Sequence, residues 1–240
     1  MPDLDLSRFK ALTFDCYGTL IDWETGILKV LRAWTRRHDA DPSDDALLTA
    51  FAEAEHTCET ETPTAAYPDI LRAAQDRIAA RLALPTSPAE ADTLAESVRD
   101  WPPFDDAPTA LATFKNHYKL VILSNIDRAS FAYANRRLGV AFDAVITAQD
   151  VGSYKPNHGH FLRAFDLLAE MGINRDETLH VAQSLFHDHV PAQALGLKTV
   201  WVDRRRGRPG WGATKPPPVE IRPNLVVPDL AGLTKLVTQS

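Results

Sequence analysis

The stretch Phe14-Asp15-Cys16-Tyr17-Gly18-Thr19-Leu20 decides the fold of this chain. An apolar run, Ala11-Leu12-Thr13-Phe14, precedes it and predicts a short buried strand. Gly18 tolerates backbone conformations that other residues avoid, so the chain can turn sharply after this strand. Asp15 is therefore expected at the carboxyl end of a strand, the edge of an open α/β sheet where ligands bind.

Outward from this strand, the sequence predicts two kinds of organisation. Up to residue 104 it shows helical periodicity only, with helices expected near residues 27–34, 43–54, 70–84 and 89–98. From residue 107 helical patterns alternate with short β-rich runs, which is typical of parallel βαβ units, and these runs are 119–123, 144–147, 178–182 and 198–202. We expect an α/β fold with a doubly wound, Rossmann-like parallel sheet from residues 1–21 and 105–240. A helical cap domain of residues 22–104, inserted after the first strand, is expected above Asp15.

Composition excludes several classes of function. The net charge of −6 gives no basic footprint for nucleic acid, and the basic run 204–208 is expected in a solvated loop. The sequence has no apolar run of roughly 18 residues and no secretory h-region, so we expect no membrane span and no export. Two cysteines are too few for a disulfide scaffold, which favours a cytoplasmic protein. The apolar residues of the expected helix 229–237 make a homodimer possible.

Polar residues follow the later strands of the expected sheet. Ser124-Asn125 follows the second strand, Lys155 precedes Pro156 after the third, and Gln183-Ser184 and His187-Asp188 follow the fourth. Because the carboxyl ends of parallel strands meet at one edge of a sheet, we expect these side chains to face one cavity with Asp15 and Thr19.

This ordered set of motifs resembles the haloacid dehalogenase superfamily, and within it the type II L-2-haloacid dehalogenases. The resemblance runs from Phe9 to about Val202. Most members of the superfamily transfer phosphoryl groups, usually with an Asp two residues after the nucleophile and an acid in the fourth motif that helps to hold magnesium. Here these positions are Tyr17, a poor acid at neutral pH, and the neutral Gln183. The resemblance thus implies a hydrolase that needs no metal and no cofactor.

The resemblance also implies covalent catalysis on a small-molecule 2-haloalkanoate. Asp15 would attack C2 of an (S)-2-haloacid, displace halide and form an ester, and water would then release the (R)-2-hydroxyacid. Lys155 would hold Asp15 ionised. Thr19, Ser124 and Asn125 would orient Asp15 or bind the substrate carboxylate, and Tyr17 and Gln183 are expected at the substrate.

The group that activates the hydrolytic water is the first departure from the family pattern, which carries Ser and Asn beside the Asp of the fourth motif. Here His187 precedes Asp188 and is expected to act as a general base with a pKa near neutrality. Glu24 is expected to orient His187 through a second hydrogen bond. Asp188 is expected to fix Lys155 or the start of the following helix, and His180 is expected in the core.

The halide pocket is the second departure. The family's arginine on the first long cap helix is absent from residues 45–51, and its tyrosine six residues after the lysine is Phe161 here. Phe161 is therefore a candidate substrate contact. Further candidates for this pocket are Trp23, His56, Tyr67 and Arg72.

Two other functions stay open at this point. An altered pocket is also compatible with another bond, either a phosphate ester cleaved with magnesium or a strained C–N ring next to a carboxylate. A protein that only binds a small acid, without catalysis, is the alternative outside enzymes.

Overall fold

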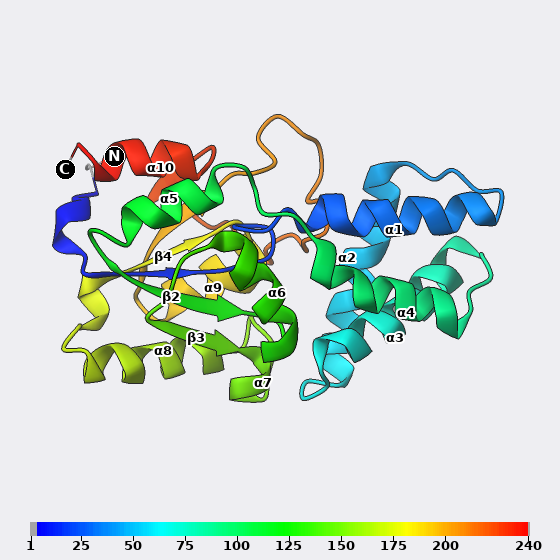
Figure 1. Cartoon of the computed structure of the whole chain (residues 1–240), viewed down its shortest axis with the longest axis horizontal. Coiled ribbons are helices and arrows are strands. Elements are labelled where there is room, and N and C mark those ends of the chain that lie inside the picture. Colours follow the sequence, from blue (N-terminus) through cyan, green and yellow to red (C-terminus); the bar gives the residue numbers. More distant parts are fainter. Residues whose placement is uncertain (1–3, 240) are drawn as a thin grey trace.

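A single parallel sheet forms the centre of the computed structural model, which describes residues 4–239 (Figure 1). Its strand order is β3-β2-β1-β4-β5-β6, and every neighbouring pair is parallel. The strands are β1 (Ala11–Phe14), β2 (Lys119–Ser124), β3 (Ala144–Thr147), β4 (Thr178–Ala182), β5 (Lys198–Val202) and β6 (Leu225–Val227). The chain winds outward from β1 in one direction and then in the other, so the doubly wound α/β sheet expected from the sequence is confirmed.

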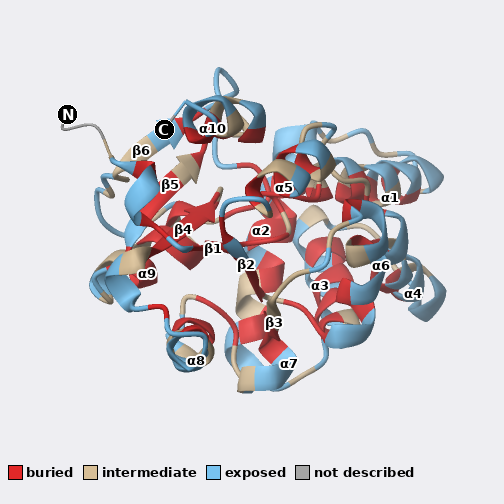
Figure 2. Ribbon diagram, turned by 60° about the vertical axis from the view of Figure 1, so that its left-hand side comes forward, coloured by how far each residue is buried: buried red, intermediate tan, exposed pale blue. Residues whose placement is uncertain are grey.

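Helices cover both faces of the sheet, and the strands are buried between them (Figure 2). Successive strand residues point to opposite faces, so Leu12 and Phe14 belong to one apolar cluster and Ala11 to the other. Residues of α5 (Ala107–Phe114), α6 (Arg128–Leu138) and α10 (Leu230–Val237) pack in the first cluster. Residues of α8 (Gly159–Glu170) and α9 (Val190–Ala194) pack in the second. Burial on both faces explains why these strands read as continuous apolar runs.

Four helices between β1 and β2 lie beyond the carboxyl ends of the strands (Figure 1). We call them the cap helices: α1 (Trp23–Arg37), α2 (Asp44–Glu61), α3 (Tyr67–Leu82) and α4 (Pro88–Ser97). Asp22, Ser43 and Ser87 cap the amino ends of α1, α2 and α4 by accepting backbone N–H groups. The division into two domains at residues 21/22 and 104/105 stays a prediction.

The two segments that join the cap helices to the sheet lie side by side. Ile21 forms an antiparallel bridge with Pro103. The N–H of Phe104 donates to the carbonyl of Leu20 over 2.9 Å. The chain therefore leaves the sheet and returns to it at one place, directly after the stretch that carries Asp15.

Trp101 fixes the returning segment against α1. Its indole lies on Gly26, where an added Cβ would stand 2.1 Å from the Trp101 ring, so only glycine allows this approach. The indole N–H donates to the Ser97 hydroxyl over 3.0 Å, and the ring meets Tyr17 edge-on with centroids 5.7 Å apart. The cap helices are in this way packed directly onto the strand end at the site.

Some elements differ from the sequence prediction. Strand β6 and the short helix α7 (Ala148–Val151) are additional, and a π-helical turn, Leu185–His189, precedes α9. The basic run is not fully solvated, because Arg204 donates to the carbonyl of Thr19 and pairs with Asp106. Within residues 4–239, no helix is both long enough and apolar enough to span a membrane.

Candidate active site

Asp15 lies at the carboxyl end of β1 and is 6% exposed. Its backbone N–H donates to the carbonyl of Val181 on the neighbouring strand. One carboxylate oxygen, Oδ2, accepts from the Thr19 hydroxyl over 2.7 Å, and Oδ1 accepts from Lys155 Nζ over 2.9 Å. Both oxygens are thus held, so the carboxylate has a fixed orientation toward the space above the sheet.

The turn after Asp15 depends on a close approach to the core. Gly18 has φ +94°, and a Cβ there would stand 3.1 Å from both Gln183 Oε1 and Trp23 Nε1. The same turn places the Thr19 hydroxyl, which accepts from the backbone N–H of Gln183 over 2.9 Å. Thr19 therefore has its donor directed at Asp15, as the sequence predicted.

Lys155 is the cation of the site and is 1% exposed. Besides Asp15, its ammonium donates to Asp188 Oδ1 over 2.7 Å and to the carbonyl of Leu123 over 2.8 Å. Burial disfavours the charged ammonium, but the two carboxylates outweigh it and hold the pKa of Lys155 above its ordinary value. Lys155 thus stays protonated and binds Asp15 and Asp188 together.

Asp188 contacts Lys155, which is one of the two positions that the sequence suggested for it. Burial opposes its ionisation, but Lys155 and His180 outweigh burial, so its pKa lies below the ordinary value for Asp. His180 Nε2 lies 3.1 Å from Asp188 Oδ1, and His180 Nδ1 lies 2.9 Å from the Thr13 hydroxyl. Fully buried, His180 is the core histidine that was expected.

Asn125 holds the Lys155 segment, and Ser124 faces the cavity. The Asn125 side chain accepts from the Lys155 N–H over 2.7 Å and donates to the Lys155 carbonyl over 3.1 Å. The same amide reaches the cap, where it donates to Glu59 Oε1 over 3.3 Å. The Ser124 hydroxyl is buried and has no partner among the described residues, which leaves it free for a ligand.

These side chains line a cavity of about 30 Å³ between the sheet and the cap helices, enough for roughly two water molecules. Its lining within residues 4–239 contains no arginine. Of the residues predicted for the site, the structure brings together here Asp15, Tyr17, Trp23, Ser124, Asn125, Lys155, His187 and Asp188, with Thr19 behind Asp15.

His187 comes from the π-helical turn after β4. Its backbone N–H donates to the Ser184 hydroxyl over 2.9 Å, and its Nδ1 lies 3.2 Å from the same oxygen. The other ring nitrogen, Nε2, is buried without a partner among the described residues. Burial, together with the charge of Lys155, lowers the pKa of His187 to about 3. The expected pKa near neutrality is therefore wrong, and His187 is a neutral imidazole at physiological pH.

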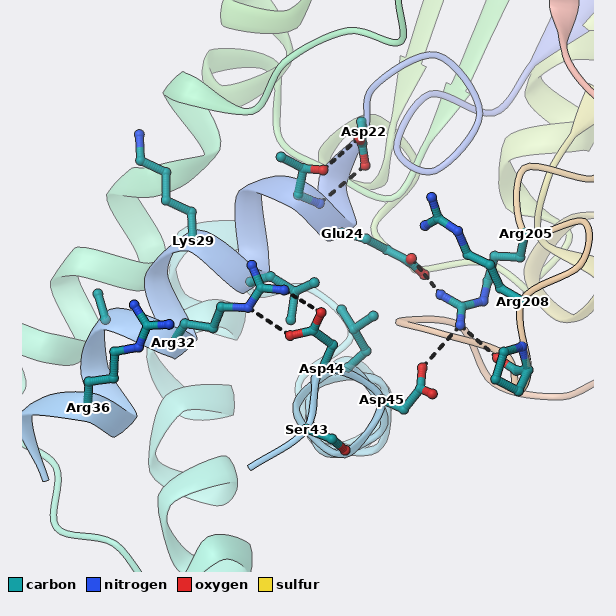
Figure 3. Close-up of a pocket in the computed structure, with 15 residues that line it drawn as sticks. Asp22, Glu24, Lys29, Arg32, Arg36, Ser43, Asp44, Asp45, Arg205 and Arg208 are labelled. Carbon is teal, nitrogen blue, oxygen red and sulfur yellow. Dashed lines mark hydrogen bonds and ion pairs between the residues drawn. The ribbon is translucent and has the colours of Figure 1, made fainter. Parts of the chain in front are cut away.

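Glu24 does not orient His187, which corrects the prediction. Its carboxylate accepts from Arg205 over 2.6 Å (Figure 3). It also accepts from the N–H of Ala213 over 3.0 Å. Arg205 also reaches Asp45 at the start of α2, so this ion pair fastens the cap helices to the loop after β5. A buried arginine far away in sequence attracts Glu24 more strongly than a neutral imidazole can.

Three further candidates do not reach the cavity. Phe161 lies in the core behind the sheet and meets His180 edge-on, with centroids 5.1 Å apart. The Gln183 amide turns away and accepts from the Thr214 hydroxyl over 3.3 Å. Arg72 is on the outer side of α3, where it pairs with Asp69 and Asp92. Phe161 and Gln183 therefore support the site from behind, and Arg72 has no part in it.

Two glutamates of α2 belong to the cavity and were missed. Glu55 accepts from the Tyr67 hydroxyl over 2.5 Å, and Glu59 accepts from Asn125. Burial raises the pKa of Glu55 to about 8 and the pKa of Glu59 well above its ordinary value. Their spacing of four residues, on the face that also carries Phe51, is the signal that could have found them.

A magnesium ion of the phosphatase type does not fit these residues. Gln183 offers no charge and its amide is turned to Thr214. Asp188 Oδ1 is already bound by Lys155 and His180, so only its Oδ2, which has no partner among the described residues, is left for an ion. We therefore derive no step through magnesium at Asp15.

A parallel sheet with helices over its carboxyl edge places a buried Asp–Thr–Lys–Asp set at that edge, where ligands of such sheets bind. The sequence model of the haloacid dehalogenase-like hydrolases matches residues 9–185, and the chain belongs to this family. A sequence search of curated proteins finds no match.

Solved structures similar to this chain are found over nearly its whole length. The L-2-haloacid dehalogenase of Xanthobacter autotrophicus is 22% identical over 96% of this chain and 98% of its own, with a TM-score of 0.76. A defluorinating L-2-haloacid dehalogenase is 21% identical over 96% and 95%, with a TM-score of 0.72. The HAD-hydrolase YfnB of Bacillus subtilis, solved with magnesium, is 16% identical over 96% and 99%, with a TM-score of 0.75. At these identities the likeness establishes the fold alone.

Proposed function

We propose that this hydrolase converts (S)-2-haloacids to (R)-2-hydroxyacids and halide, without a metal, through an ester on Asp15. The observation that carries the proposal is the fixed Asp15 carboxylate beside Lys155, in a small cavity that His187 also lines. Tyr17 and Gln183 stand where phosphatases of the superfamily have acids. Two of the similar structures are named L-2-haloacid dehalogenases, which supports the same choice.

In the first half-reaction, a carboxylate oxygen of Asp15 attacks C2 from the side opposite the halogen. The C–O bond forms while the carbon–halogen bond breaks, and the electron pair leaves with the halide. Attack from behind inverts C2. The unpartnered Ser124 hydroxyl is placed to donate to the substrate carboxylate, which holds C2 in line with Asp15.

In the second half-reaction, water attacks the ester carbon of Asp15. The neutral His187 accepts the proton of this water through Nε2, because Ser184 can accept Nδ1–H. Negative charge on the Asp15 oxygens is stabilised by the Lys155 ammonium and the Thr19 hydroxyl. The bond between the Asp15 carboxyl carbon and the oxygen on C2 then breaks, and His187 returns its proton to that oxygen. The 2-hydroxyacid leaves and Asp15 is restored as a carboxylate.

The test is halide release from L-2-chloropropionate in the presence of a chelator, with Asp15→Asn as the inactive control. We expect halide and (R)-lactate in equal amounts. Phosphate release from phosphate esters, seen only with magnesium and with no halide release from any haloacid, would contradict the proposal.

The buried Glu55 and Glu59 favour a second candidate. A protonated carboxyl beside the reacting carbon can give its proton to a basic leaving group, as in opening a strained C–N ring next to a carboxylate. Incubation with a four-membered cyclic 2-amino acid, followed by product identification, separates this candidate from dehalogenation. A hydroxy amino acid product with no halide release from any haloacid would favour it.

A further inference from the structure

Three metal-ligating side chains meet between α2 and the turn after β4. They are His56 and Glu59 on α2 and His187 on the core side, and their ligand atoms all lie within 4.8 Å of one another. His56 and Glu59 are three residues apart, so they share one face of the helix. Small side-chain rotations bring such a set to the spacing of one coordination sphere.

His187 is preorganised as a ligand. The side chain is 9% exposed, and its Nε2 has no partner among the described residues although it is buried. Nδ1 is directed at the Ser184 hydroxyl, which can accept its proton. A histidine that binds a metal through one nitrogen usually donates the other N–H in this way.

Buried carboxyl groups lie close to these ligands. Glu55 and Glu59 line the same cavity as His187, and a cation bound there would favour their ionised form. Among the described residues, the buried ammonium of Lys155 is already shared between Asp15 and Asp188.

We propose that His56, Glu59 and His187 form a site for a divalent transition-metal ion, such as Zn²⁺, that joins the cap to the core. Two imidazoles and one carboxylate suit zinc and leave a fourth position open, whereas magnesium prefers oxygen ligands only. The site goes beyond the proposed function and departs from the expectation that the protein holds no metal.

Occupancy has a consequence for catalysis. Nε2 of His187 cannot accept a proton from water while it binds a metal ion. Zinc should therefore halt turnover after the first half-reaction. It should also hold the cap against the core, since its ligands come from both.

The test uses zinc chloride alone on the metal-free, full-length protein. Competition with a chromophoric zinc chelator should show one ion per chain with a micromolar or tighter Kd. His56→Ala and Glu59→Gln should each weaken binding by about tenfold or more. His117→Ala, an exposed histidine elsewhere, should leave affinity unchanged. Cobalt should give the visible absorption of a four- or five-coordinate N/O site, and magnesium should not compete.

A second arm uses the nearby charge of Lys215, whose Nζ lies 5.6 Å from the centre of the Phe186 ring beside both histidines. Because it repels a metal ion, Lys215→Met should tighten zinc binding. Thermal unfolding of each variant without metal shows whether it folds, and zinc should raise the Tm of the parent but not of His56→Ala.

Zinc binding that persists unchanged in both His56→Ala and Glu59→Gln would overturn the proposal, as would the lack of stoichiometric binding. If Lys215→Met left the affinity for zinc unchanged, the ion would likewise have to bind elsewhere on the protein. None of these measurements needs a substrate, so a failure of the dehalogenase proposal would leave them intact.

Discussion

At the scale of single residues, the site depends on one ammonium group between two carboxylates. Lys155 donates to Asp15 and Asp188 while almost wholly buried, so neither carboxylate can turn to water instead. The two acids respond differently: Asp188 has a lowered pKa, whereas burial raises that of Asp15. Asp188 has His180 as an additional partner, whereas the second partner of Asp15 is the Thr19 hydroxyl.

Removing Lys155 should therefore destabilise the protein strongly. Lys155→Met leaves two buried carboxylates unpaired, which costs about 3–5 kcal/mol of unfolding free energy. The loss should shrink as the pH falls, because both acids can then become neutral. Urea unfolding from pH 4 to 8 measures this. The control is Lys198→Met, an exposed lysine on β5, and a loss equal to the control would contradict the role.

The raised pKa of Asp15 sets the acid limb of activity. Only the ionised carboxylate attacks carbon, so the rate of ester formation should rise with pH through a pKa above 3.8, the ordinary value for Asp. His187, with a pKa of about 3, adds no limb near 6.5. Single-turnover rates from pH 3 to 8 test this. A limb near 6.5 that disappears in His187→Ala would contradict it.

His187→Ala should separate the two half-reactions. Asp15 can still attack, but the water that hydrolyses the ester lacks its base, so the covalent adduct should persist. Intact mass after substrate addition should show it, and peptide mapping should place it on Asp15. Asp15→Asn is the control without an adduct, and normal turnover by His187→Ala would assign the base elsewhere.

Sequence reasoning predicted the position of residues that directly follow a strand. It missed an ion pair whose partners lie far apart in the sequence. Asp15, Ser124 and Lys155 follow strands whose ends must meet, so their convergence is a property of the sheet. Glu24 was assigned to His187, but Arg205, from a loop far along the chain, pairs with it. Nothing local in the sequence shows that such a pair will form.

At the scale of elements, helix α2 brings two carboxyl groups into an otherwise apolar contact. Its periodicity predicts a helix with an apolar face through Leu47, Leu48 and Phe51. Glu55 and Glu59 continue the same face and are buried when α2 closes over the site. The helix was predictable from its pattern, whereas the burial of these acids depends on the core beneath, which the pattern does not contain.

Glu55 should make stability fall as pH rises. Its pKa is raised from 4.5 to about 8 in the folded protein, so folding favours the protonated form. The stabilisation is complete below pH 4.5 and is lost as pH rises to 8. Glu55→Gln should remove this loss and be more stable at pH 8, by on the order of a few kcal/mol.

The matched control is Glu53→Gln, an exposed glutamate on the same helix. Thermal or urea unfolding of the parent and both variants between pH 4.5 and 8 measures the difference. If the stability of all three proteins changed with pH in the same way, Glu55 would ionise as freely as an exposed glutamate, which would contradict the prediction.

Among the elements of the sheet, five strands were found and β6 was missed. The five have apolar runs long enough to stand out between helices. Strand β6 consists of Leu225–Val227 alone, and two of its three residues are not fully buried. An edge strand of this length is formed by its pairing with β5 rather than by its own pattern.

At the scale of the whole molecule, the site lies where the sheet and the cap helices face each other. The sheet supplies Asp15, Lys155 and Asp188, and the cap helices supply Glu55, Glu59 and Trp23. The cavity between them has room for only about two water molecules, so we expect the cap helices to move when a larger ligand binds. The ion pair Glu24–Arg205 joins the cap helices to the loop after β5.

The hydrogen bond between Phe104 and Leu20 also affects how readily the sequence of the cap can change during evolution. The cap is an excursion of the chain whose two ends are already hydrogen-bonded, so lengthening, shortening or rewriting it adds little loop-closure entropy to the fold of the sheet. The strand that carries Asp15 keeps its place whatever the excursion contains. Selection could thus change the side chains that the cap helices place above Asp15, such as Glu55 and Glu59, while Asp15 stayed where it was.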